Sequence, residues 1–409
     1  MTSHHSSLGA AFDPSHVQVE ALPDFYDRLR QEEPVTFNPA LNAYLVSRYD
    51  DIRAIILQPE LFSSKDASFS RLDFHPQVAT ELQKGYPLKP ITFVDDGERH
   101  IRLRTPLQKI FSPAHVRTAE PIVREIVTGL IDRFVSDRQA EIISQFAYPL
   151  PLEAIFALVG IPQQDRAMVK KRYEALCTLI TPSSPLDVQV ECAREFVALQ
   201  HYFTHLIEER QKQPEDDLIS ELVRDKEAEG VPISDADLIN QIVGVMIAGH
   251  DPITHLIGNG LVLMLEEPTR WQALCENPEQ IPLVIEEILR FRGPLHGIKR
   301  TTLQQVTIGG VTIPQGTTLL LLCAAANRDE SQFPQACDFT MQRRPNPHLT
   351  LGQGIHFCIG AALTRLEGRI AFEVLTQRIP SMRLLPDQQF EYSFRMSNAG
   401  YKRIYMQWE

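Results

Sequence analysis

A cysteine near the carboxyl end of the chain stands in a setting that favours its charged form. In "LGQGIHFCIGAALTRLEGRIAFEVL", a glycine-rich loop places Cys358 just before an apolar-periodic segment that begins near Gly360 and is typical of a helix. The start of a helix carries partial positive charge and free N–H groups, which stabilise a thiolate and make it a competent metal ligand. A buried cysteine in a turn is the alternative. A phosphate loop is disfavoured, because no Lys-Ser or Lys-Thr follows the glycines.

A second pattern, "EEILRFRGP", spaces Glu287 and Arg290 three residues apart, so that both side chains lie on one helical face and can form an ion pair. Most such pairs are solvated. The neighbouring residues are apolar on more than one face of the helix, which indicates an enclosed helix and a buried pair that needs further partners.

Basic residues form a third pattern in "DDGERHIRLRTPLQKIFSP", where His100 and Arg104 lie four residues apart on one helical face. This arrangement suits an anionic carboxylate, as does Arg300 in "GIKRTT". A solvated basic face is the alternative interpretation of the same residues.

The stretch "GVMIAGHDPITHLIGNG" places a proline in an otherwise buried helical pattern, although proline costs about 3 kcal/mol in a helix interior. Pro252 has no N–H for the carbonyl of Ala248, so the helix is expected to kink or open there. Asp251 precedes the proline and could hold a proton.

The elements that must position these residues are mainly helical. Apolar residues recur at three- and four-residue steps in the segments from Val123, Leu152, Phe196 and Leu218, which predicts amphipathic helices. Strand signals are few: Val35 to Phe37 and Tyr44 to Val46, and a hairpin around Gly309 and Gly310. The polar region from Ser63 to Asp96 is predicted to be a loop.

Composition sets further limits. The formal charge of −12 argues against nucleic acid or an anionic membrane as the main partner, since both need a basic face. Six cysteines without paired spacing fit reduced thiols. The longest apolar run, "LLLLCAAA", is too short to span a bilayer, and the first residues lack a signal-peptide pattern. The chain is therefore expected to be soluble and cytoplasmic.

Taken together, these residues resemble the cytochrome P450 family, specifically its soluble bacterial class, along nearly the whole chain. The resemblance rests on "GQGIHFCIG", "EILR", "HIRLR", "AANRD" followed by "FTMQR", and "AGHD". It implies a mainly α fold, a triangular helical domain with small β-sheets that spans residues 1–409 as a single domain, and haem b (iron protoporphyrin IX) as the cofactor.

The resemblance also assigns roles to residues. Cys358 would be the proximal thiolate and the iron ligand, and Glu287 and Arg290 would be structural and meet the segment near Arg343. Basic side chains would contact the haem propionates, and residues of the central helix and the cysteine loop would border the haem. These cofactor-binding residues are His100, Arg104, Ala248, Gly249, Arg300, Leu351, Gly352, His356 and Gly360.

Two positions depart from the family pattern. Leu351 stands where a phenylalanine usually packs beside the thiolate, so redox tuning could differ. Pro252 stands where members commonly have a threonine whose hydroxyl helps to deliver protons during oxygen activation. The acid, Asp251, is kept. Proton delivery must then use Asp251, ordered water, a substrate hydroxyl, or His250 or Thr254, although Thr254 lies about 200° around the helix from Pro252.

The resemblance implies an enzyme that activates dioxygen, with electrons from a separate ferredoxin and ferredoxin reductase, and oxidises a small-molecule substrate. Substrate contacts would include Val245, Leu295, His296 and Ile298, a mix that fits a medium-sized, mainly apolar or aromatic natural product. A peroxide-driven peroxygenase is an alternative, which the acid at position 251 disfavours. A haem-binding sensor without turnover is the third possibility.

Overall fold

The computed structural model describes residues 7–14, 18–65, 74–89, 92–180, 184–226, 233–396 and 398–409. The chain forms two compact units: unit 1 comprises Met1–Ala67, Val116–Leu152 and Gly249–Glu409, and unit 2 comprises Ser68–His115 and Glu153–Ala248. One long helix, α11 (Asp235–Leu265), contributes residues to both. The expectation of one domain over residues 1–409 stays a prediction.

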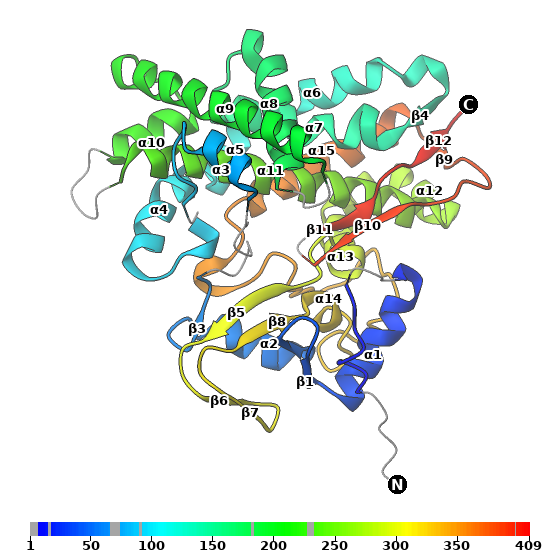
Figure 1. The fold of residues 1–409 in the computed structure, drawn as a ribbon. Coiled ribbons are helices and arrows are strands. Elements are labelled where there is room, and N and C mark those ends of the chain that lie inside the picture. Colours follow the sequence, from blue (N-terminus) through cyan, green and yellow to red (C-terminus); the bar gives the residue numbers. More distant parts are fainter. Residues whose placement is uncertain are drawn as a thin grey trace. The chain divides into compact units, whose positions relative to one another are not determined.

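Unit 1 combines helices with all of the small sheets of the described chain (Figure 1). Its helices are α1 (Leu22–Glu32), α2 (Tyr49–Ile56), α6 (Glu120–Asp132), α12 (Pro268–Glu276), α13 (Ile281–Arg292), α14 (Cys323–Ala326) and α15 (Ala361–Arg378). Its strands are β1 (Val35–Asn38), β2 (Ala43–Val46), β3 (Phe62–Ser63), β4 (Gln139–Glu141), β5 (Ile298–Thr302), β6 (Val306–Ile308), β7 (Val311–Ile313), β8 (Thr318–Leu321), β9 (Arg383–Leu384), β10 (Tyr392–Arg395), β11 (Asn398–Tyr401) and β12 (Tyr405–Gln407).

The largest sheet has the strand order β1-β2-β8-β5-β3, in which β2 and β8 are parallel and the other neighbours are antiparallel. Side chains alternate along β8, as the pleat of a strand requires. Leu319 and Leu321 pack into a cluster with Ile52 and Ile55 of α2, whereas Leu320 packs with Leu29 of α1. Both faces of this sheet are therefore covered by apolar side chains.

The predicted hairpin is present as β6 and β7, which pair with Ile308 opposite Val311. Gly309 and Gly310 form its turn with φ angles of +54° and +82°, a conformation that glycine adopts at little cost. The predicted strands at Val35 and Tyr44 are also confirmed, since β1 and β2 form an antiparallel pair.

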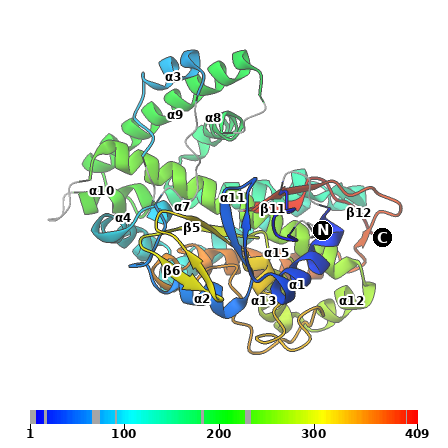
Figure 2. The same ribbon diagram turned by 60° about the horizontal axis from the view of Figure 1, so that its bottom comes forward.

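Unit 2 is helical in its described residues. Its helices are α3 (Pro76–Leu82), α4 (Gly97–Ile110), α8 (Arg166–Leu179), α9 (Leu186–Lys212) and α10 (Leu218–Lys226). Figure 2 shows α8 alongside α9, with α3 against α9 as well. The loop prediction for Ser63 to Asp96 is wrong at α3, because a proline in the first turn of that helix and Val78 on its buried side support a short amphipathic helix.

Two shorter helices join the units along the chain, α5 (Pro113–Thr118) and α7 (Pro149–Val159). The helices predicted from Val123, Leu152, Phe196 and Leu218 correspond to α6, α7, α9 and α10. Within the described part of the chain, every helix is too short or too polar to cross a bilayer.

Candidate functional site

Short backbone contacts hold Cys358 in the loop before α15. Its N–H donates to the carbonyl of Leu351 at 2.8 Å, and its own carbonyl accepts from the N–H of Ala361 at 3.3 Å. Gly352 and Gly354 both have φ of +67°, in the left-handed region that other residues adopt only with strain. The half-buried thiol therefore lies beside the first turn of α15, where the helix dipole favours a thiolate.

Positive charge adds to this effect. A hydrogen bond with Glu286 raises the pKa of the Arg365 guanidinium, and the charge of a Cys358 thiolate raises it further. Arg365 and the cysteine thus stabilise each other in their charged forms. A Cβ at Gly360 would lie 4.0 Å from Sγ, so the chain passes close to the sulfur here.

Glu287 and Arg290 of α13 form a bidentate ion pair with neither side chain exposed. Arg290 Nη2 and Nε lie 2.7 and 2.8 Å from the two carboxylate oxygens. Arg343 donates to both oxygens at 3.0 and 3.1 Å, and the N–H of Thr340 and the amide of Asn346 complete the set. The pair therefore has the extra partners that a buried charge needs.

The same helix also holds the start of the cysteine loop. Thr350 donates its hydroxyl to the carbonyl of Leu289 in α13 at 2.6 Å and accepts from Asn327 at 2.8 Å. Asn327 in turn accepts from the N–H of Leu349. Because α13 is fixed by buried charges, it is a rigid support for the loop that presents the cysteine.

The two predicted propionate contacts of unit 1 lie on different elements. Arg300 is in β5, 6% exposed, and one of its nitrogens donates to the carbonyl of Lys299 at 2.7 Å. His356 lies in the single turn of 3-10 helix at Gly354–His356, two residues before the cysteine.

In unit 2, His100 and Arg104 lie one turn apart on α4, and His100 is almost fully buried. Burial lowers the pKa of His100, and the charge of Arg104 lowers it further. Arg99 anchors this helix to the start of α11 through a 2.7 Å contact with Asp237. The sequence spacing thus places both predicted side chains on one anchored helix.

The central helix carries the predicted catalytic residues. His250 is fully buried: Nε2 lies 3.1 Å from the carbonyl oxygen of Tyr148, and Nδ1 lies 3.2 Å from Oδ1 of Asp251. The Tyr148 ring meets the imidazole edge to face at 4.3 Å. The Asp251 side chain is 45% exposed, in contrast to its buried neighbour.

Helix α11 continues through Pro252 without interruption, so the helix does not open there, and the expected kink stays a prediction. The bond from position 252 to the carbonyl of Ala248 is still missing, because proline has no N–H. Flanking tertiary contacts hold the helix together. The Thr254 hydroxyl donates to the carbonyl of His250 at 3.3 Å, which is a local structural contact and leaves its catalytic role a prediction.

Two ionisable residues beside Asp251 were not found by sequence reasoning. Burial acts to raise the pKa of Asp251, but the hydrogen bond with His250 lowers it, and His255, one turn further along α11, and Arg395 in β10 in their charged forms lower it further. A Cβ at Gly400 of β11 would lie 2.3 Å from Nδ1 of His255, so the hairpin packs directly on this ring. The four-residue spacing from Asp251 signals His255, whereas nothing local signals Arg395.

The predicted substrate residues are spread over two elements. Val245 and the predicted haem-bordering residues Ala248 and Gly249 lie on α11 just before His250, and only Val245 is buried. Leu295 and Ile298 are half-buried around β5. Their part in substrate binding stays a prediction.

His296 is buried within unit 1 by contacts that involve no ligand. Its ring lies 3.1 Å from the Tyr26 hydroxyl and meets Phe394 edge to face at 4.8 Å. Its backbone N–H donates to the carbonyl of Met396 at 2.9 Å. The segment around His296 is therefore joined to Met396, which follows β10, and the next residue, Ser397, lies outside the described residues.

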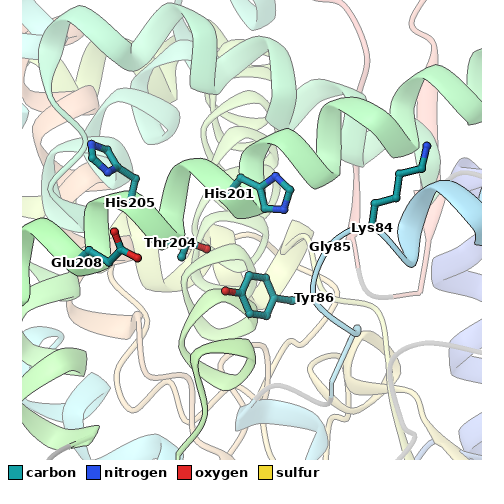
Figure 3. A pocket seen from close by; sticks show the side chains of 7 residues that line it. All are labelled: Lys84, Gly85, Tyr86, His201, Thr204, His205 and Glu208. Atoms are coloured by element: carbon teal, nitrogen blue, oxygen red, sulfur yellow. The ribbon is translucent and has the colours of Figure 1, made fainter.

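A hollow of about 360 Å³ lies on unit 2, between α9 and the chain after α3 (Figure 3). It contains none of the predicted site residues. The lining residues are Lys84, Gly85, Tyr86, His201, Thr204, His205 and Glu208.

Comparison with known proteins identifies the class. A model of the cytochrome P450 family matches residues 60–393. The chain is 32% identical over 366 residues to the putative cytochrome P450 YjiB of Bacillus subtilis (strain 168). This match covers 88% of this chain and 87% of that protein. It is 33% identical over 405 residues to the mycinamicin IV hydroxylase/epoxidase of Micromonospora griseorubida. This match covers 97% of this chain and 98% of that protein.

Among solved structures, an intact type IV self-sufficient cytochrome P450 monooxygenase matches with a TM-score of 0.92 at 28% identity. The match covers 98% of this chain and 53% of that one, so this chain spans about half the length of that protein. The chain belongs to the cytochrome P450 family, and its predicted fold class is confirmed. It is a P450 monooxygenase.

The cofactor of the family is haem b, and the donor chemistry of this chain fits it. Cys358 offers a thiol at a helix start beside a guanidinium. Arg300 and the histidines at 100 and 356 offer nitrogen donors of the kind that bind carboxylates. When bound, a haem with a thiolate ligand supplies dioxygen activation and favours O–O cleavage.

Proposed function

We propose that this monooxygenase oxidises a medium-sized, mainly apolar or aromatic compound of the natural-product type, with electrons supplied by a separate ferredoxin. We further propose that its proton delivery is atypical, because Pro252 removes the hydroxyl that family members commonly use. The name of the mycinamicin relative supports the substrate class.

One observation carries the proposal on proton delivery: the Asp251 carboxyl group combines exposure with charged neighbours. Burial alone would raise its pKa, but the hydrogen bond with His250 and the charges of His255 and Arg395 together lower the pKa. A carboxylate held in this way can accept a proton from one side and release it on the exposed side.

The roles of the side chains follow from their contacts. His250 orients Asp251 through Nδ1, and the Tyr148 carbonyl in turn orients His250. Pro252 can neither donate nor accept a proton, so a water molecule or a substrate hydroxyl must connect Asp251 to the reacting oxygen. A substrate that carries a hydroxyl would fill this gap.

The test compares Asp251→Asn and Pro252→Thr in the haem-loaded enzyme. We expect Asp251→Asn to lower product formed per electron pair by about 100-fold, which is within the usual range for loss of a general acid. Pro252→Thr should raise coupling. Unchanged coupling in both variants would exclude this route, and equal turnover with peroxide alone would favour the peroxygenase alternative.

The substrate class is tested by optical titration of the ferric protein with fatty acids, terpenoids, aromatic compounds and macrolides. A high-spin shift confined to fatty acids would contradict the proposed class. A hydroxyl-bearing ligand that both shifts the spectrum and couples well would support substrate-assisted proton transfer.

The proposed ferredoxin would approach the face near Cys358, where Arg365 and Arg369 supply positive charge. Both arginines are ion-paired, Arg365 with Glu286 at 2.6 Å and Arg369 with Glu120 at 2.7 Å. The positive charge that these two arginines offer to a partner is therefore partly neutralised. Unchanged reduction rates in Arg365→Glu and Arg369→Glu would exclude this docking face.

A further inference from the structure

Two buried amide side chains of unit 2 hold the chain segment that precedes α4. Gln200 of α9 accepts from the N–H of Tyr86 and donates to the carbonyl of the same residue, both at 3.0 Å. Asn240 of α11 accepts from the N–H of Lys89 at 3.2 Å and donates to the carbonyl of Pro87 at 3.0 Å. Each of these amides therefore uses both its oxygen and its nitrogen.

Gln241, the next residue of α11, uses its oxygen alone. Its Oε1 accepts from the hydroxyl of Thr92 at 2.9 Å and from the N–H of the same residue at 3.5 Å. Because a backbone N–H can only donate, this contact fixes which end of the amide is the oxygen. Among the described residues Nε2 has no hydrogen-bond partner, although Gln241 is only 2% exposed.

A buried amide nitrogen that forms no hydrogen bond is costly and unusual in a folded protein. The Gln241 nitrogen carries two N–H groups and can only donate. The group that satisfies it must therefore be an acceptor, such as a ketone, ester or ether oxygen or a water molecule.

The position of Gln241 on α11 relates this donor to the proposed substrate. Val245 and Ala248 follow at steps of four and three residues, so the three side chains lie on one face of the helix. This is the face that carries a predicted substrate contact, Val245, and a predicted haem-bordering residue, Ala248. Thr92, the partner of Oε1, precedes α4, which carries His100, another predicted haem contact.

We infer that Gln241 is a specificity-determining residue, whose Nε2 donates a hydrogen bond to an oxygen acceptor of the substrate. The inference rests on the proposed function and deepens it, because it names a polar group that the otherwise apolar substrate carries. Seven residues of helix rise by about 10 Å, so this oxygen lies about 10 Å from the part of the substrate beside Ala248. A single placed donor in an apolar pocket selects the ligands that can pair with it.

The test measures two affinities in the haem-loaded enzyme by optical titration, for cyclopentadecanone and for cyclopentadecane. The two rings are alike in size, and only the ketone offers an acceptor. We expect the wild type to bind the ketone about tenfold more tightly, because the hydrocarbon leaves the Nε2 donor unpaired. Gln241→Met keeps the length of the side chain without its amide and should bind the two rings with similar affinity.

Thr92→Val is the matched control. It removes the hydroxyl that donates to Oε1 and leaves Nε2 and the backbone N–H at position 92 in place, so the preference for the ketone should persist. Because the two rings are compared in the same protein, a general loss of affinity or stability cancels in the ratio. The same preference in the wild type and in Gln241→Met would overturn the inference. Equal affinity of the wild type for the two rings would overturn it without any variant.

The outcome is separable from that of the proposed function. An unchanged ratio in Gln241→Met, in an enzyme that binds macrolides or terpenoids, would end only the inference on Gln241. If fatty acids alone shift the spectrum, the proposed substrate class is wrong, and palmitate replaces the two rings as the probe. Weaker binding of palmitate to Gln241→Met than to Thr92→Val would then support the donor, and equal binding would exclude it.

Discussion

The hydroxyl of Tyr26 in α1 and Nδ1 of His296 lie 3.1 Å apart inside the core of unit 1. Burial lowers the pKa of His296 to about 4, and the charge of Arg328 adds to this effect. Burial also raises the pKa of Tyr26. Both groups are therefore neutral at pH 7, and the bond between them joins the amino-terminal helix to the segment before β5.

This contact predicts a loss of stability in acid. His296 has a folded-state pKa below the ordinary value of 6.5, so the unfolded chain binds more protons between pH 6.5 and 4. The free energy of unfolding should fall by about 3 kcal/mol over this window through His296 alone. Urea unfolding at both pH values measures it. On acidification, the free energy of unfolding of His296→Gln should fall less than that of the wild type. His205→Gln, at an exposed site, should behave as wild type. Equal losses in all three proteins would contradict the assignment.

Glu287→Gln should be strongly destabilising. The variant leaves the guanidinium of Arg290 buried without its countercharge, which typically costs about 3 to 5 kcal/mol. Urea unfolding measures the change, and haem retention on dilution should decline with it. Glu32→Gln removes the partner of Arg28 in an exposed helical pair and should unfold close to wild type. Similar curves for the two variants would show that the buried network is not a structural support.

Cys358→Ser should retain a folded chain but lose thiolate ligation. The Soret band of the carbon monoxide complex should then lack the long-wavelength position that a thiolate ligand confers, and turnover should cease. Cys337→Ser is the matched control, because Cys337 is an exposed thiol. A normal spectrum in Cys358→Ser would exclude this cysteine as the ligand.

Gly310→Ala should destabilise the β6–β7 hairpin through backbone strain alone. The residue has φ of +82°, and a Cβ there would meet no atom within 4 Å, so steric contact plays no part. We expect a loss of about 1 kcal/mol in the free energy of unfolding. Gly310→Asn should lose less, because asparagine tolerates positive φ better. A larger loss for asparagine than for alanine would contradict this explanation.

Much of the site was predictable because its patterns are local. The three-residue spacing of Glu287 and Arg290, the cysteine before a helix and the glycine pair between two β-branched runs each specify geometry within a few residues. Of the two outcomes expected at Pro252, a kink or an opening, the opening is not present, for the complementary reason. A proline removes one helical hydrogen bond, but flanking contacts such as that of Asn259 with Arg292 and Ala399 hold α11 in place.

The sequence by itself determined the helical class and the family, and it predicted the residues proposed to carry the chemistry, because periodicity and short motifs act over a few turns of chain. Only the tertiary structure decided which distant groups contact each buried polar side chain: Tyr148 contacts His250, 102 residues away, Arg343 contacts Glu287, 56 residues away, and Tyr26 contacts His296, 270 residues away. No local rule links such pairs. They form because each buried polar group must find a partner when the core closes around it.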